Sequence, residues 1–210
     1  ANASPIFSVQ VARDTLGRII EKSETIGGDY KTFSYGYDVN GRLAEVEEGG
    51  IPVAAFTYDG NGNRMSLTGT MGPTTYTYDD QDRLLTLTSG GQSQSFTYTG
   101  NGELSGKTAG SLHPAYQYDE LGNLLAVSLP DGSQITYVID GKNRRIGKKV
   151  NDVLVQGWLY QDRLRPVAEL DGSGNLLARF VYGSRRNVPD YLIKGGNIYR
   201  LIADHLGSVR

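Results

Sequence analysis

The aspartates are the residues of this sequence whose type and spacing come closest to chemistry, because they recur along the chain within short turn-like segments. Regular carboxylates would suit acid–base catalysis or the binding of a divalent cation. Acid–base catalysis needs paired groups with perturbed pKa values in one pocket, whereas these aspartates occur one to a turn. We therefore expect no catalytic residue and predict that the protein is not an enzyme. A hydrolase in particular would need convergent carboxylates, which the pattern does not offer.

A metal site is also disfavoured by the residue spacing. The segment Asp59–Asn63 (DGNGN) resembles the start of a calcium-binding loop. An EF-hand also needs Gly at its sixth position and a bidentate Glu at its twelfth, where this sequence has Arg64 and Thr70. The two histidines, His113 and His205, have no nucleophile elbow or metal-ligand spacing around them. We predict plain turns, structural histidines, no metal and no cofactor.

The composition narrows the class of protein further. The chain has 210 residues, with 21 Lys+Arg, 23 Asp+Glu and a net charge of −2. A dedicated nucleic-acid or anionic-membrane surface would need a basic excess, so neither partner is expected. Cysteine is absent, which excludes disulfides and thiolate metal sites, and no run of about 18 apolar residues could span a membrane. The 28 Gly and 14 Tyr residues favour many short strands over helices.

The aspartates belong to an internal repeat with the pattern aromatic-x-Tyr-Asp-x-x-Gly-(Arg/Asn)-Leu. The Asp slot is filled by Asp14, Asp38, Asp59, Asp79, Thr99, Asp119, Asp140, Asp171 and Asp204. Successive slots are 24, 21, 20, 20, 20, 21, 31 and 33 residues apart. The central steps are too regular for chance, and each of the two long steps leaves room for about one extra hairpin.

The slot three residues after the aspartate predicts the geometry of the turn. It is filled by Gly17, Gly41, Gly62, Asp82, Gly102, Gly122, Asn143, Gly174 and Gly207. Gly, Asn and Asp are the residues that tolerate a positive φ. An aspartate three positions earlier can accept hydrogen bonds from turn N–H groups. Together these slots predict a hairpin loop built on a type I turn and closed by a left-handed residue.

The flanking residues predict strands on both sides of each turn. Aromatic pairs at i and i+2 precede the clearest turns and end at Tyr37, Tyr58, Tyr78, Tyr98 and Tyr118. Since strands have a period of two, each pair shares one face, where the rings can form cross-strand ladders. Arginines directly after the turn are expected to lie over a neighbouring Tyr ring, namely Arg18, Arg42, Arg83 and Arg144.

Looser Gly-rich turns separate the copies, so each repeat reads as strand, tight turn, strand and loose turn. The predicted fold is all-β, with consecutive antiparallel hairpins of about 20 residues forming a long, curved or spiralling sheet. We expect residues 1–210 to form a single array, with an edge liable to self-association at each end.

The repeat resembles the YD repeat of bacterial Rhs proteins, of the related Tc-toxin shell subunits and of the teneurins. The closing segment Asp204–Arg210 (DHLGSVR) is similar to a segment found late in the Rhs core. This resemblance implies a fragment of a longer β-sheet shell that encloses a C-terminal toxin or effector domain, its cargo partner. The self-cleavage motif of some members, Asp-Pro-x-Gly-Leu, does not occur in this sequence.

The resemblance therefore implies a non-enzymatic structural module of a secreted or cell-surface bacterial protein. The alternative is an extracellular carbohydrate-binding or cell-adhesion module, in which exposed Tyr and Arg side chains contact cell-surface glycans. Packing already accounts for eleven of the 20 aromatic residues, which fill the two aromatic slots of the repeat. Saturable saccharide binding that is lost on Tyr→Ala at a solvent-facing repeat position would favour the alternative.

Overall fold

The computed structural model describes residues 6–204 and 207–209. Within that part of the chain there are nineteen strands and no helix, and hence no helix of the length and apolarity needed to cross a membrane. The predicted all-β class of consecutive antiparallel hairpins is confirmed. The chain divides between Phe96 and Thr97, within strand β9, into two compact units that are described separately below.

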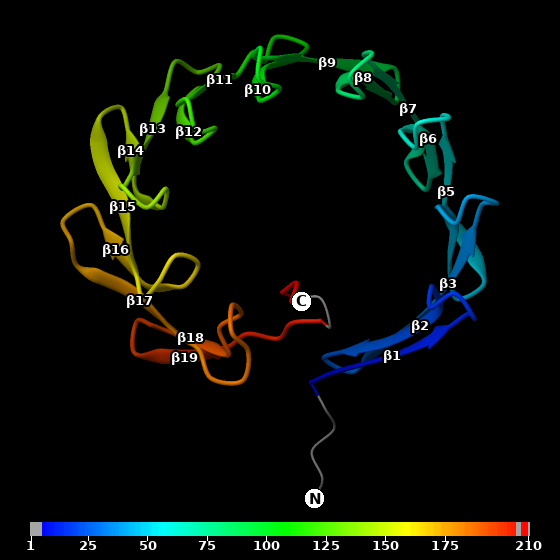
Figure 1. The fold of residues 1–210 in the computed structure, drawn as a ribbon. Helices are drawn as coiled ribbons and strands as arrows, with labels where there is room; N and C mark the ends of the chain where they lie inside the picture. The colour runs from blue at the N-terminus through cyan, green and yellow to red at the C-terminus, as the bar shows by residue number, and fades with distance from the viewer. Residues whose placement is uncertain (1–5, 205–206, 210) are drawn as a thin grey trace, which may run out of the picture. The chain divides into compact units, whose positions relative to one another are not determined.

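In the first unit each strand pairs antiparallel with the next one along the chain, and in Figure 1 these strands follow an arc. The strands are β1 (Phe7–Arg13), β2 (Ile19–Ile26), β3 (Asp29–Tyr37), β4 (Leu43–Glu48), β5 (Ile51–Tyr58), β6 (Arg64–Gly69), β7 (Gly72–Tyr78), β8 (Leu84–Ser89) and β9 (Gln92–Tyr98), whose last two residues belong to the second unit.

The second unit repeats this sequential antiparallel pairing from β10 to β19. Its strands are β10 (Leu104–Ala109), β11 (Ala115–Tyr118), β12 (Leu124–Ser128), β13 (Gln134–Ile139), β14 (Arg145–Val150), β15 (Val153–Tyr160), β16 (Pro166–Asp171), β17 (Leu176–Val181), β18 (Tyr191–Lys194) and β19 (Asn197–Arg200).

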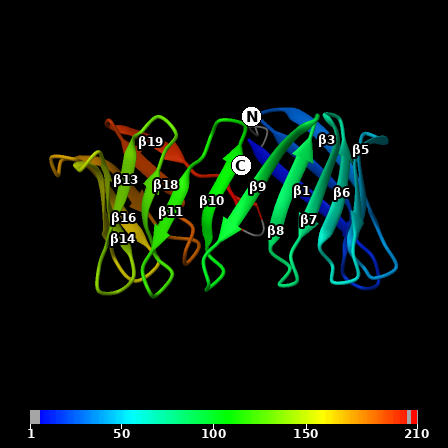
Figure 2. The ribbon, with the colours of Figure 1, turned by 90° about the horizontal axis from the view of Figure 1, so that it is seen from above.

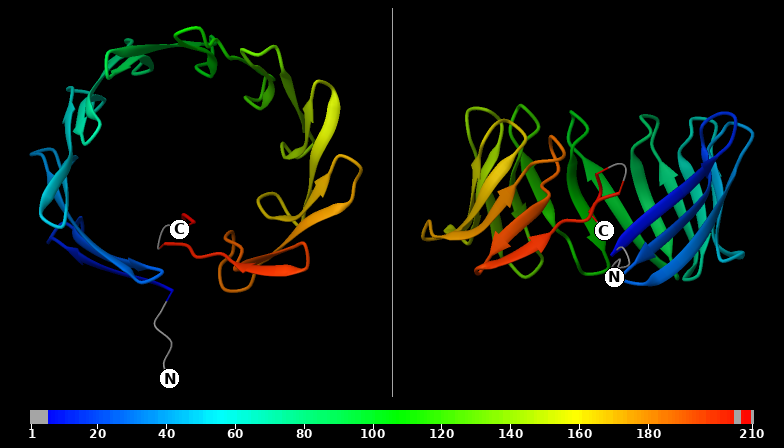
Figure 3. Two further views of the ribbon diagram at one scale, coloured as in Figure 1. Left: turned by 180° about the vertical axis from the view of Figure 1, so that it is seen from behind. Right: turned by 90° about the horizontal axis from the view of Figure 1, so that it is seen from below.

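The connections alternate between the two ends of the strands, as the loops of β6, β7 and β8 show in Figure 2. The right-hand view of Figure 3 shows the same alternation from the other side. At one end lie tight two-residue turns such as Gly49–Gly50 and Asn151–Asp152, in which both residues have positive φ. That geometry matches the twist of the flanking strands, and Gly and Asn are among the residues that tolerate it.

At the other end lie the turns that begin with the motif aspartates, except that of Asp171. In one of them the N–H of Asp38 donates to the carbonyl of Arg42 at 2.9 Å, and the N–H of Gly41 donates back to Asp38 at 2.9 Å. The slot predicted to be left-handed has φ between 58° and 96° at every position, including Asp82 and Asn143. The backbone thus requires the residue types that the sequence places there.

The two long steps of the repeat have a different cause from the one predicted. Between Asp140 and Asp171, and again between Asp171 and Asp204, the chain forms three strands where a regular step has two. Each long step therefore adds one strand and not one hairpin. Because every strand reverses the chain direction, an odd number places the turn of Asp171 and Gly174 at the opposite end of the strands from that of Asp140.

Each unit is built from a single layer of strands, so neither unit has a deep core. In the described residues no large side chain is completely buried, and Tyr76, at 6% exposure, is the least exposed aromatic residue. On β7 the side chains of Thr74, Tyr76 and Tyr78 face the better-covered side, while Thr75 and Thr77 are exposed on the other. The strands are therefore held by lateral contacts between neighbours more than by burial beneath a second layer.

We expect Gly62→Ala to lower the free energy of unfolding by about 1–2 kcal/mol, because an L-residue pays that cost in the left-handed region. The φ of Gly62 is 95°, and a Cβ there would touch no other atom, so the cost is conformational. Chemical denaturation of the purified chain measures the effect.

The matched control is Gly60→Ala in the same turn. Gly60 lies outside the left-handed region and is also surrounded by open space, so alanine there should be neutral or stabilising. Equal losses at the two positions would contradict the role assigned to the left-handed slot.

Candidate functional site

Each motif aspartate first organises its own turn. One carboxylate oxygen of Asp38 accepts hydrogen bonds from the N–H groups of Asn40 and Arg42 at 2.9 and 2.8 Å. Its second oxygen accepts from Nε of Arg42 at 2.7 Å. The same double use of the carboxylate recurs at Asp14, Asp79 and Asp140. The aspartate thus holds both the turn and the arginine that follows it.

The arginine then joins its repeat to the next. The guanidinium of Arg42 lies over the ring of Tyr58, 4.7 Å from the centroid, and its Nη1 donates to the carbonyl of Asp59 at 2.8 Å. The hydroxyl of Tyr58 donates in the reverse direction, to the carbonyl of Leu43 at 2.6 Å. We term this set of contacts, from the aspartate through the arginine to the tyrosine of the next repeat, the latch.

The preceding pair of repeats in the first unit is joined in the same way. Arg18 lies 4.6 Å from the ring centroid of Tyr37, whose hydroxyl donates to the carbonyl of Ile19 at 2.6 Å. The cation–π contacts predicted for Arg18, Arg42 and Arg144 are therefore confirmed. The sequence did not predict that the tyrosine hydroxyl also binds the backbone of the preceding repeat.

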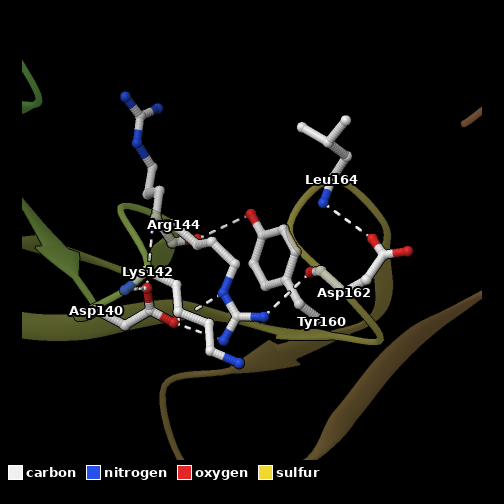
Figure 4. Close-up of polar contacts among 7 residues, drawn as sticks. Asp140, Lys142, Arg144, Tyr160, Asp162 and Leu164 are labelled. Atoms are coloured by element: carbon white, nitrogen blue, oxygen red, sulfur yellow. Dashed lines mark hydrogen bonds and ion pairs between the residues drawn. The ribbon is translucent and has the colours of Figure 1, made fainter.

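Figure 4 shows the latch of the second unit. Both Nε and Nη2 of Arg144 contact Oδ2 of Asp140, at 2.8 and 2.6 Å, while Nη1 reaches the carbonyl of Asp162 at 3.0 Å. The guanidinium lies 5.1 Å from the ring centroid of Tyr160, and the Tyr160 hydroxyl donates to the carbonyl of Arg145 at 3.0 Å. One guanidinium therefore connects two successive turns.

Where asparagine replaces the arginine, amide groups make the connection. Nδ2 of Asn63 contacts Oδ2 of Asp59 at 3.0 Å and Oδ1 of Asp82 in the next turn at 2.6 Å. Asp82, which departs from the Gly of the motif, thereby supplies an acceptor that glycine lacks. Arg64 lies over the ring of Tyr76 at 4.7 Å, and its carbonyl accepts the Tyr78 hydroxyl at 2.9 Å.

The remaining copies in the second unit vary the turn chemistry further. Thr99 and Glu103 replace the Asp–Arg pair, and their side chains hydrogen-bond to each other beside Gly102. Asp119 holds Asn123, with Nδ2 of Asn123 2.7 Å from Oδ2 of Asp119, and Gly122 completes that turn. Tyr98 and Tyr118 end β9 and β11 in the slot that Tyr58 fills at the end of β5.

In the second unit, one turn at the same end of the strands as Asp140 was missed from the sequence. It spans residues 161–165 and begins with Gln161, 21 residues after Asp140. Its carboxylate belongs to Asp162, one position later, and accepts from Nε of Arg165 at 2.7 Å. The Tyr182 hydroxyl closes the latch by donating to the carbonyl of Pro166 at 2.9 Å. Two features of the sequence could have revealed this turn: Tyr160 directly before it, and the step of 21 residues from Asp140.

Asp171 and Gly174 form the same kind of turn, but not at the end of the strands where Asp140 lies. Oδ1 of Asp171 accepts from the N–H groups of Ser173 and Asn175 at 2.9 and 2.8 Å. The turn joins β16 to β17, at the opposite end of the strands from Asp140. The sequence placed it as the next copy after Asp140, which was wrong because an odd number of strands separates the two.

The last repeat turn begins at Asp204 and is contacted by the connection between β17 and β18. Asp204 is 5% exposed, and its Oδ1 accepts from the N–H of Ser208 at 3.0 Å, with Gly207 in the left-handed slot. Nη1 of Arg185 donates to the carbonyl of Asp204 at 2.8 Å, as Arg42 does to Asp59. His205 lies outside the described residues. Nδ1 of His113 lies 3.3 Å from Oγ1 of Thr108.

The electrostatics of these turns favour ionised carboxylates. Hydrogen bonds from the side chain of Arg144 are the largest cause that lowers the pKa of Asp140 from 3.8 to about 2, and Arg165 lowers the pKa of Asp162 to about 2. Backbone N–H groups act in the same direction. Carboxylates held in this way serve as permanent acceptors and are poorly suited to proton transfer near neutral pH. Across the described residues, no three His, Asp or Glu side chains are grouped to hold a metal ion.

Comparison with known proteins gives one family and several distant structures. The family model of the teneurin YD-shell matches residues 2–210. The chain is also similar to the Photorhabdus luminescens Tc holotoxin pore (13% identity, TM-score 0.39) and to the TcdB2-TccC3 crystal structure (12% identity, TM-score 0.42). Each of these matches covers 95% of this chain and 15% of the chain it matches. No curated protein matches the chain.

We expect Tyr58→Phe to lower the free energy of unfolding by about 0.5–1.5 kcal/mol, the net contribution of a typical hydrogen bond. The change deletes the hydroxyl that binds the carbonyl of Leu43 but keeps the ring under Arg42. Urea denaturation measures the loss. The control is Tyr199→Phe, at a side chain that is 50% exposed. If Tyr58→Phe left the free energy of unfolding unchanged, the hydroxyl contact with Leu43 would not contribute to stability.

Acid should weaken the native state between about pH 4 and pH 2. Because folding lowers the pKa values of Asp140 and Asp162 to about 2, ionised carboxylates stabilise the folded chain above their unfolded pKa. That stabilisation disappears as the pH falls through the folded values. Denaturation midpoints measured from pH 6 to pH 2 test this dependence.

The double variant Asp140→Asn, Asp162→Asn should be less stable than the parent at pH 6 and should lose less stability on acidification. The corresponding control is Asp80→Asn, at an exposed position in a turn. If the double variant kept the full acid dependence of the parent, the latches would not be its source.

Proposed function

Because the chain belongs to the teneurin YD-shell family, we propose that it is a non-enzymatic wall segment of a shell that encloses a cargo polypeptide, such as a toxin or effector domain. In this role the segment acts sterically, by separating the cargo from its surroundings. The protein that contains it would be secreted or displayed at the cell surface, where such a cargo is delivered.

The observation that carries this proposal is how the motif side chains are used. The carboxylate of Asp140, the guanidinium of Arg144 and the hydroxyl of Tyr160 all bind other parts of the latch. Groups engaged in this way hold successive hairpins together and are not themselves free to act in catalysis. The family membership and the contacts therefore favour the same structural role.

Glycan binding through the motif tyrosines has less support. The hydroxyls of Tyr37, Tyr58 and Tyr78 donate to backbone carbonyls, and cations lie over the rings of Tyr37 and Tyr58. A sugar stacked on these rings would have to displace the arginines. An adhesion role would therefore need aromatic side chains outside the motif.

Protease protection in the full-length protein tests the shell. A polypeptide enclosed by the wall should survive a protease concentration that degrades the same polypeptide expressed alone. The variant Tyr58→Ala, Tyr160→Ala removes two latches and should expose the cargo, whereas Tyr199→Ala should leave it protected. A polypeptide digested equally fast inside and outside the intact protein would contradict encapsulation, as would the lack of any enclosed polypeptide.

We also propose that the 210-residue chain, produced alone, associates through its first and last strands. Val11 on β1 is 39% exposed and Ile198 on β19 is 71% exposed, and terminal strands of a hairpin array offer unpaired backbone groups. Analytical ultracentrifugation should show concentration-dependent association that Val11→Lys, Ile198→Lys reduces. Leu16→Lys, in the first repeat turn, is the control. A strictly monomeric parent, or equal association in all variants, would contradict edge pairing.

A further inference from the structure

One junction between repeats in the second unit lacks two members of the latch. The position directly before the turn of Asp140 is Ile139, whereas the other turns from Asp38 to 161–165 are preceded there by Tyr37, Tyr58, Tyr78, Tyr98, Tyr118 and Tyr160. The residue that faces this position from the preceding turn is Asn123 in place of an arginine. An amide contact crosses the junction instead, with Nδ2 of Asn123 3.3 Å from Oδ1 of Asn143.

A hollow of about 390 Å³ lies at this junction. Its lining consists of Asn123, Leu124, Ile139, Asn143, Arg145, Trp158 and Tyr160. Both residues that replace members of the latch are among them, and both are smaller than the residues they replace. The volume falls within the range of small-molecule sites, about 300–1,000 Å³. The strands that carry the lining, β12 to β15, follow one another within the second unit (Figure 1).

The junction also leaves one backbone acceptor without a side-chain donor. In the complete latches the tyrosine hydroxyl donates to the carbonyl of the residue directly after the arginine, as Tyr160 does to Arg145. The corresponding residue at this junction is Leu124, and no side chain in the described part of the chain donates to its carbonyl. The ladder between β12 and β13 begins only at Ala126 and Thr136, so it does not extend to Leu124.

Aromatic and apolar side chains border the hollow. Trp158 and Tyr160 lie two residues apart on β15 and therefore share one face of that strand. The ring of Tyr160 is fixed by Arg144 and by its hydroxyl bond (Figure 4), while Trp158 is half-buried. Together with Ile139, these rings offer the kind of surface on which a further aromatic ring can stack or pack edge to face.

The charge beside the hollow is positive. Ile139 pairs in register with Arg145, and Tyr137 pairs with Lys148, so the two cations border the same face. The guanidinium of Arg145 lies 3.8 Å from the ring centroid of Tyr137. Among the described residues, neither Arg145 nor Lys148 has a carboxylate partner for its side chain. Arg145 can therefore offer its N–H donors to an anion, and a carboxylate matches them in a bidentate geometry.

These features select one chemical class of ligand. A cation would be repelled by Arg145, and the carboxylates of the two adjoining turns are already bound, Asp119 by Asn123 and Asp140 by Arg144. Within the described residues the lining contains no acidic side chain. A wholly apolar ligand would leave both Arg145 and the Leu124 carbonyl without a polar partner. A ring that carries a carboxylate satisfies the cation and the aromatic surface together.

We propose that the hollow at Ile139 is a binding site for a small aromatic carboxylate. Its ring packs against Ile139 and Trp158, and its carboxylate binds the guanidinium of Arg145. A hydroxyl on the ring replaces that of the missing tyrosine and donates to the carbonyl of Leu124. The site is separate from the shell role, because the side chains of Ile139, Arg145 and Trp158 belong to no latch.

Isothermal titration of the 210-residue chain tests the site, with 4-hydroxyphenylacetate as the probe. Phenylacetate lacks the hydroxyl, 4-methylphenol lacks the carboxylate, and tyramine carries a cation in its place. We expect saturable binding of 4-hydroxyphenylacetate, weaker binding of phenylacetate and no binding of tyramine. Binding of 4-methylphenol should be at least about tenfold weaker, and Arg145→Gln should weaken binding of the probe to a similar extent.

The variant Ile139→Tyr fills the hollow with the residue found at the other junctions. It should abolish binding of 4-hydroxyphenylacetate, because its ring and hydroxyl take the place of those of the ligand. The same variant should unfold at the temperature of the parent or above it, since the new hydroxyl can bind the carbonyl of Leu124. Thermal unfolding therefore separates lost binding from lost folding.

The matched control is Arg64→Gln in the first unit. Arg64 follows Asn63 as Arg145 follows Arg144, but at its junction Tyr78 is present and donates to its carbonyl. This variant should bind the probe as the parent does. The proposal is overturned if 4-hydroxyphenylacetate does not bind, if 4-methylphenol binds as tightly, or if affinity survives Ile139→Tyr. Cargo protection in the full-length protein is independent of these outcomes.

Discussion

The fold of this chain depends on side chains such as Arg42, Arg144 and Asn63, each of which follows a repeat turn and belongs to two repeats at once. Arg144 is held by the carboxylate of Asp140 and donates to the carbonyl of Asp162 in the following turn. A planar guanidinium suits this position, since it offers several donors in fixed directions and a flat face for Tyr160. A lysine could supply the charge but not the fork. The aspartate is equally necessary, because it fixes the turn and aims the guanidinium.

This arrangement explains how strands in a single layer can be stable with so little burial. A 20-residue hairpin alone is marginal in water, and the described residues include no completely buried large side chain. Each latch instead joins neighbouring hairpins through one stacked cation and hydrogen bonds to backbone carbonyls. Such nearest-neighbour contacts are the usual source of stability in repeat proteins. The energy is distributed along the chain, so the loss of one latch should weaken the array locally.

The same constraint separates the structural residues from those available for binding. Motif tyrosines such as Tyr37 and Tyr58 are covered by cations and bonded through their hydroxyls. A tyrosine outside the motif, such as Tyr30, makes no such contacts and is exposed. The motif side chains are thus committed to contacts between repeats, while Tyr30 is not.

Sequence alone was sufficient for the all-β class, for the hairpin period and for the left-handed slots, because those features depend on local backbone preferences. Gly62 and Asn143 could be assigned from residue type, since few residues tolerate a positive φ. The end of the strands on which a turn lies was not local: it depends on how many strands intervene, so Asp171 was misplaced and the turn 161–165 was missed. The partners of the Tyr58 and Tyr160 hydroxyls likewise required the tertiary structure. They are set by the register between strands, which brings together residues that lie fifteen positions apart in the chain.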